Sequence, residues 1–178
     1  MDFFEVIQKR YSHKQTFLPN AVGLDCLEAI AAAGLAAPTG GNAQAVRLII
    51  LKDKQTMEPL CEIINSAQLH TAPSAIVLFT DSATQTGSDN FEIEDYSAAT
   101  ENMILATFAL GYVTNWLDSP FFEPETVEST KRLLGVPNTY TPRIVLPIGL
   151  PNGEGTRRSK LPFNQRVSYG YFNRGKEK

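Results

Sequence analysis

Residues 94–110 have the sequence EDYSAATENMILATFAL, and this stretch predicts the longest helix of the chain. Apolar side chains surround most of the helix circumference in its second half, from Met103 to Leu110. A helix that is apolar nearly all round is buried on most of its sides. In a chain of 178 residues, the stretch therefore predicts either a central helix or a helix that a partner subunit covers.

Shorter segments with helix and strand patterns lie around this long helix. Apolar spacing predicts further helices over 2–10, 24–35, 54–66 and 124–134. Apolar and β-branched runs predict strands over 46–51, 75–80, 112–117 and 143–150. The polar residues 81–92 are expected to form a loop. The alternation is less regular than in a doubly wound sheet, so the predicted fold class is α+β, with a small mixed central sheet flanked by helices.

Composition and charge exclude several classes of protein. No internal repeat or linker divides the chain, so residues 1–178 are expected to form a single domain. A net charge of −3 argues against a general nucleic-acid binder. No apolar run is long enough to span a membrane. Because Cys26 and Cys61 form no dense disulfide framework and no signal peptide precedes them, we expect a cytoplasmic protein.

The usual catalytic constellations are missing from the sequence. His13 and His70 lie far apart in the chain, and neither cysteine has a partner at metal-ligand spacing, so we expect no metal site. The acidic residues at the start of the long helix are expected from the helix dipole alone; they are Glu92, Glu94 and Asp95. We therefore expect no protein side chain to act as nucleophile or acid–base catalyst.

Three segments carry features of a binding site. Arg10, Ser12 and Lys14 stand at alternate positions, and in extended chain they would share one face, which suits a phosphorylated ligand. Residues 38–44 combine two glycines with amides, which both donate and accept hydrogen bonds, as the edge of a heteroaromatic ring requires. Residues 158–160 add cations. Taken alone, the two basic segments are more typical of solvated chain, and the loop is equally typical of a plain turn.

Phosphate contacts and amides without a catalytic dyad make sense where a cofactor carries the chemistry. Flavin mononucleotide (FMN) fits this description. Its phosphate needs an Arg or Lys clamp, and its pyrimidine edge needs hydrogen-bond donors and acceptors.

Together these motifs resemble the nitroreductase family of FMN-dependent oxidoreductases over nearly the whole chain. The matching motifs, in order, are Lys9-Arg10-Tyr11-Ser12-His13-Lys14, the loop from Ala37 to Gln44, the helix from Ser97 to Gly111-Tyr112, and Arg158-Ser159-Lys160-Leu161-Pro162. The sequence departs from the family after Gln44, where Ala45-Val46 replaces the common Pro-Trp and Arg47 stands near the position of the aromatic residue.

The resemblance implies a homodimer with the long helix at its interface and with FMN sites built from both subunits. It implies that Arg10, Ser12, Arg158 and Lys160 hold the phosphate and that Lys14 lies near the electron-rich edge of the flavin. The full set of cofactor-binding residues implied is Arg10, Tyr11, Ser12, Lys14, Pro38, Thr39, Asn42, Gln44, Arg158 and Lys160.

The implied activity is a ping-pong oxidoreduction. NADH or NADPH would be the reductant, and a nitroaromatic, a quinone or a similar flat small molecule would be the acceptor. Two alternatives stay open at this point. One is a protein of the same fold that stores FMN or senses redox state, and the other is a related flavin enzyme with a different reaction.

Overall fold

The structure is a computed structural model that describes residues 1–84 and 90–172. Its helices are α1 (Phe3–Lys9), α2 (Leu24–Leu35), α3 (Lys54–Ile63), α4 (Ala67–Thr71), α5 (Glu92–Ala109) and α6 (Pro124–Leu134). Its strands are β1 (Val46–Leu51), β2 (Ser74–Asp81), β3 (Val113–Thr114) and β4 (Tyr140–Gly149). Short 3-10 turns occupy Gly40–Asn42, Ser82–Thr84, Ser119–Phe122 and Phe163–Gln165.

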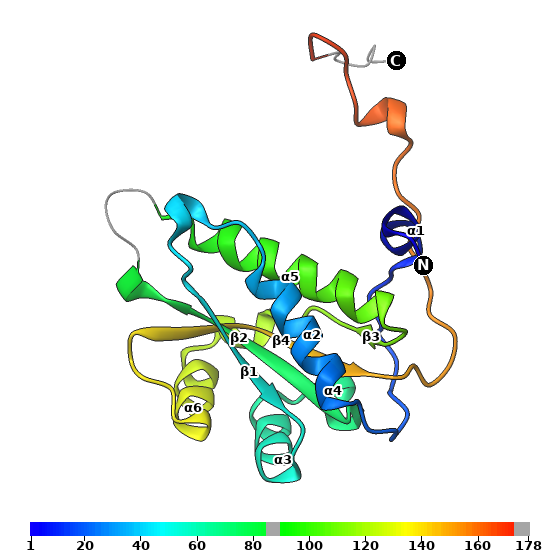
Figure 1. Cartoon of the computed structure of the whole chain (residues 1–178). Coiled ribbons are helices and arrows are strands. Elements are labelled where there is room, and N and C mark those ends of the chain that lie inside the picture. Colours follow the sequence, from blue (N-terminus) through cyan, green and yellow to red (C-terminus); the bar gives the residue numbers. More distant parts are fainter. Residues whose placement is uncertain (85–89, 173–178) are drawn as a thin grey trace.

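The strands form one sheet in the order β1-β2-β4-β3, with helices on both faces (Figure 1). Helices α2 and α5 cover one face, and α3 and α6 cover the other. Strand β2 is buried along its whole length because its side chains serve both layers. Ile76 and Leu78 pack in the α2/α5 core, whereas Val77 and Phe79 pack in the α3/α6 core.

The predicted α+β class is confirmed, but the expected mixed sheet is wrong. Every strand pair of the described residues is antiparallel. The reason lies between β1 and β2, where a single helix over 54–66 was expected. The first helix ends at Ile63 and the separate helix α4 follows it. The chain returns to the end of β1, so that Leu51 pairs with Ala75.

The long central helix is confirmed as α5, and it begins two residues before the predicted start. The polar segment 81–92 is only partly a loop, because β2 includes Asp81 and α5 begins at Glu92; residues 85–89 lie outside the described residues. The predicted strand over 112–117 is shorter, with β3 at Val113–Thr114 and one further bridge at Leu117.

The N-terminus and the last described residues lie on the same side of the molecule (Figure 1). Helix α1 stands beside α5, and the segment after β4 runs past α1 and away from the body (Figure 1). We call residues 152–172 the C-terminal tail. All of its residues are exposed. None of the helices in the described residues is both long and apolar enough to cross a membrane.

Candidate functional site

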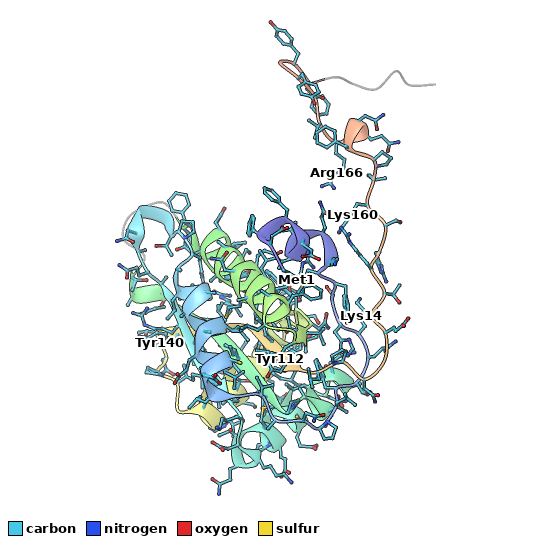
Figure 2. All side chains as sticks on the ribbon, turned by 45° about the vertical axis from the view of Figure 1, so that its right-hand side comes forward. Met1, Lys14, Tyr112, Tyr140, Lys160 and Arg166 are labelled. Atoms are coloured by element: carbon cyan, nitrogen blue, oxygen red, sulfur yellow. The ribbon has the colours of Figure 1, made fainter. Side chains whose placement is uncertain are left out.

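A cavity of about 580 Å³ lies between the N-terminal segment and the C-terminal tail. Residues from both segments line it: Ile7, Arg10, Tyr11, Ser12, His13, Lys14, Gln15, Gly155, Thr156, Arg157, Arg158 and Lys160. Figure 2 shows the two segments side by side, with Lys14 on the first and Lys160 on the tail. The structure therefore brings together the two basic segments of the sequence, which are more than 140 residues apart.

Residues 10–14 follow α1 without forming a helix or a strand, and Arg10 has φ of −55° and ψ of 140°. Tyr11 packs edge-on against Phe108 of α5, with ring centroids 6.0 Å apart. His13 is fully buried, 4.8 Å from the Phe17 ring, and its Nε2 donates to the Thr16 carbonyl at 2.8 Å. Because these two side chains are used in packing, the alternate residues Arg10, Ser12 and Lys14 are left to face the cavity.

The contacts of His13 show that it fixes the backbone of this row. Its amide N–H donates to the Thr114 carbonyl of β3 at 2.9 Å. Burial of an imidazole is not encoded in a five-residue motif, and only the fold shows it.

The environment of Arg10 indicates which kind of ligand the cavity suits. The Arg10 Nε is buried and makes no hydrogen bond, although it forms an ion pair with a carboxylate oxygen of Glu101 on α5 at 3.5 Å. A buried N–H without an acceptor is costly, and this cost is larger for a charged group. An anionic oxygen is the acceptor that a guanidinium prefers. The cavity is therefore chemically suited to an anion such as a phosphate.

The tail is held close to the N-terminal segment at Gly155. A Cβ at this position would overlap the Tyr11 ring, so the backbone of the tail lies directly on that ring. Burial raises the pKa of the Tyr11 hydroxyl above its usual value. Tyr11 was predicted to bind the cofactor; it lines the cavity, but its ring is packed between Phe108 and the tail.

The tail carries one cation that the sequence prediction omitted. Arg157 lines the cavity beside the predicted Arg158 and Lys160. Because Arg157 directly precedes Arg158 in the sequence, it could have been predicted to line the same site. With Arg10 and Lys14, the cavity has five lining cations in a chain whose net charge is −3. The positive charge is thus concentrated at this cavity.

The second predicted segment, Pro38 to Gln44, lies elsewhere. The Gly40 amide donates to Asp95 near the start of α5 at 2.7 Å, whereas Tyr11 contacts Phe108 near the end of the same helix. Thirteen residues of α-helix span roughly 20 Å at 1.5 Å per residue. One chain therefore does not bring the loop residues Pro38, Thr39, Asn42 and Gln44 to the cation-lined cavity.

The loop exposes its two amide side chains. Asn42 and Gln44 are both exposed. The hydrogen bonds of these two residues come from their backbone. The Gln44 backbone N–H donates to the Thr39 hydroxyl at 3.1 Å, and the Asn42 backbone N–H donates to the Thr39 carbonyl at 3.0 Å. The sequence prediction explained Asp95 by the helix dipole alone. In the structure Asp95 is buried, and its carboxylate accepts a hydrogen bond from the loop.

The fold and the cavity together define an α+β protein with a cation-lined site. A family model described as the nitroreductase family matches residues 7–75 and 61–150. A protein of Archaeoglobus fulgidus with the provisional name NADH dehydrogenase/NAD(P)H nitroreductase is 31% identical over 129 residues, which are 72% of this chain and 74% of that protein. The chain belongs to the nitroreductase family.

Solved structures agree with this assignment. The crystal structure of a protein with the same provisional name from Parabacteroides distasonis has a TM-score of 0.83 and 26% identity, covering 95% of this chain and 98% of that one. The structure of an FMN-dependent nitroreductase from Clostridium difficile has a TM-score of 0.81 and 22% identity, covering 95% and 99%. At that identity, the second likeness shows the fold alone.

Proposed function

We propose that this chain is an FMN-dependent oxidoreductase that uses NADH or NADPH to reduce nitroaromatics, quinones or a similar flat acceptor. In this proposal residues 1–178 form one FMN-binding domain, and two copies form the active homodimer. The observation that carries the proposal is the cation-lined cavity, where Arg10 holds a buried nitrogen without a hydrogen-bond acceptor.

The residues of the cavity match the phosphate end of FMN. Arg10 and the tail residue Arg158 offer planar forks of donors, and Lys160 is a compact charge on a flexible stem that can close on the anion. The exposed Ser12 hydroxyl can donate one further hydrogen bond. A phosphomonoester carries close to two negative charges at neutral pH, so several cations around one cavity are an appropriate match.

The ring end of the flavin requires the amide loop, and this requirement supports a dimer. The loop and the cavity lie at opposite ends of α5, roughly 20 Å apart. A second copy placed antiparallel along α5 would bring the loop of one subunit to the cavity of the other. Each site would then take its phosphate contacts from one chain and the amides of Asn42 and Gln44 from its partner.

Exposed apolar side chains support the same assembly. On α1, Phe3 is 64% exposed and Phe4 is 72% exposed. Further large exposed side chains lie near the two ends of α5 and on the C-terminal tail; they are Ile93, Leu110, Leu161, Phe163, Tyr169, Tyr171 and Phe172. Exposed apolar side chains that gather together mark interaction sites in soluble proteins, and Phe3 and Phe4 form such a pair, with ring centroids 5.7 Å apart.

The chemistry that FMN supplies when bound is the transfer of hydride from a nicotinamide to a second substrate in two alternating half-reactions. The protein side chains then have to bind and orient rather than to act as nucleophile. A cation at Lys14 would stabilise negative charge on a neighbouring ring, and the cations that line the cavity would hold and orient the phosphate. This division of labour agrees with the lack of a catalytic dyad in the sequence.

Reconstitution of the purified protein tests the proposal. The protein is incubated with FMN, freed of excess ligand and examined by absorbance, and NADH or NADPH is then added without oxygen. We expect a protein-bound flavin band that bleaches with the nicotinamide and returns when a quinone or nitroaromatic is added. A bound flavin that neither nicotinamide bleaches would instead point to FMN storage or redox sensing. A protein that takes up no FMN would contradict the proposal.

A further inference from the structure

The amide loop holds an unusual backbone conformation. Gly41 has φ of 55°, Asn42 has φ of 57° and Gln44 has φ of 52°. Residues with a Cβ rarely adopt this left-handed region, and such strain persists only where surrounding contacts enforce it. The contacts that enforce it here are therefore worth identifying, because they set where the Asn42 and Gln44 amides point.

The first of these contacts is at the start of the loop. Asp95 of α5 is only 4% exposed, and its Oδ1 accepts the Gly40 amide N–H at 2.7 Å. A Cβ on residue 40 would overlap the Phe91 side chain, so the Gly40 backbone lies directly against the start of α5. A carboxylate that accepts a backbone N–H makes a charge-assisted hydrogen bond, which is stronger than a neutral one.

The second contact is at the end of the loop. Arg47 of β1 donates from Nη1 to the Gln44 carbonyl at 2.6 Å and to the Val46 carbonyl at 3.0 Å. In the sequence Arg47 stands next to Val46, the position at which the resembling family motif commonly has an aromatic residue. The Arg47 guanidinium therefore binds the backbone of the loop, and its side chain remains exposed.

We propose that Asp95 and Arg47 are positioning residues that hold residues 40–44 in the conformation presenting Asn42 and Gln44 to the flavin ring. This inference rests on the proposed function. Asp95 acts through the Gly40 amide and Arg47 through the Gln44 carbonyl. Together they fix both ends of the strained segment, so that the amide side chains are oriented before the ligand arrives. Preorganisation of this kind raises affinity by lowering the ordering cost of binding.

The experiment compares Asp95→Ala and Arg47→Met with two control variants. Asp53→Ala removes an exposed carboxylate that makes no capping hydrogen bond, and Arg132→Met removes an exposed guanidinium on α6. Dissociation constants are measured for FMN and for riboflavin, which has the same ring but no phosphate. Hydrogen exchange of the amides of residues 40–44 is measured in the flavin-free protein.

We expect Asp95→Ala to raise the dissociation constant about tenfold, the lower end of what a hydrogen bond to a charged group contributes. We expect a smaller rise, about threefold, for Arg47→Met, because exposed charges are screened by water. FMN and riboflavin should lose affinity by the same factor, since the loop meets the ring they share. Exchange of the Gly40 amide should become faster in Asp95→Ala, and both controls should match the wild type.

Two results would overturn the inference. A wild type that binds flavin, with Asp95→Ala and Arg47→Met binding it equally well, would show that the loop needs neither contact. Lower thermal stability with unchanged dissociation constants would assign both residues a structural role only. If Asp95→Ala does not fold, Arg47→Met decides the test, because its side chain is exposed. A wild type that binds no flavin would reject the proposed function, and this inference with it.

Discussion

Replacing Arg10 by alanine probes the phosphate end of the site most sharply. Arg10 has a buried Nε without a hydrogen-bond partner, and a carboxylate oxygen of Glu101 lies 3.5 Å from it. A bound phosphate would supply the missing acceptor. Hydrogen bonds to charged groups contribute roughly 1.5–3 kcal/mol, so Arg10→Ala should raise the FMN dissociation constant by about 10- to 150-fold.

The assay is a titration of each ligand, followed by the change in flavin fluorescence on binding. Riboflavin lacks the phosphate, so its dissociation constant should be unchanged in Arg10→Ala. Arg10→Lys keeps the charge and loses the planar fork, so it should fall between alanine and the wild type. Arg132→Ala, on the exposed face of α6, is the control for loss of one positive charge.

Two outcomes would refute the assignment of Arg10. An unchanged FMN dissociation constant in Arg10→Ala would show that the phosphate lies elsewhere. An equal loss for FMN and riboflavin would show that Arg10 acts on the ring or on the fold. Either result would leave the buried Nε to be explained by Glu101 alone.

Three further predictions concern the tail, the core and the packing beneath the cavity. Gly155→Ala should weaken FMN binding, because its Cβ would overlap the Tyr11 ring and displace the tail, and a second change, Tyr11→Ala, should restore part of the loss in the same titration. Leu27→Ala, fully buried in the α2/α5 core, should lower the free energy of unfolding by about 2–5 kcal/mol in urea; a loss below about 1 kcal/mol would contradict the packing. Burial raises the Tyr11 pKa, so the folded state keeps the proton longer than the unfolded state, whose pKa is about 10. Stability should therefore fall as the pH rises above that value, and Tyr11→Phe should lose less in urea unfolding over the same range.

Much of the fold follows from the apolar spacing of the sequence. The helices over 24–35 and 124–134 and the strand over 46–51 have the predicted bounds. They are long segments with clear periodicity, flanked by residues such as Gly135, whose φ of 65° closes α6. In such segments local propensity and burial favour the same structure.

The direction of the strands did not follow from the sequence. It depends on the break at Ile64–Ser66 and on α4, a helix of five residues that is too short for apolar periodicity to reveal. A single helix between β1 and β2 would be compatible with a crossover to a parallel strand. With two helices, the chain returns to the end of β1 at which it left, and β2 pairs antiparallel to β1. A turn of a few residues thus decides whether the sheet is mixed or antiparallel.

The site likewise has features that the sequence predicted and features that it did not. Alternate spacing predicted that Arg10, Ser12 and Lys14 would share one face if the chain were extended, and all three line the cavity. The motifs did not predict contacts between segments that are distant in the sequence. The hydrogen bond from Gly40 to Asp95 joins residues 55 apart, and the separation of the loop from the cavity depends on where both meet α5.

Anaerobic absorbance of the reconstituted protein, before and after addition of NADH or NADPH, tests the central proposal most directly. The account predicts a bound flavin band that bleaches with one or both nicotinamides and is restored by a quinone or nitroaromatic. It also predicts that Arg10→Ala retains less of the band than Arg132→Ala after removal of free FMN. A wild-type protein that stays colourless in excess FMN would contradict the account.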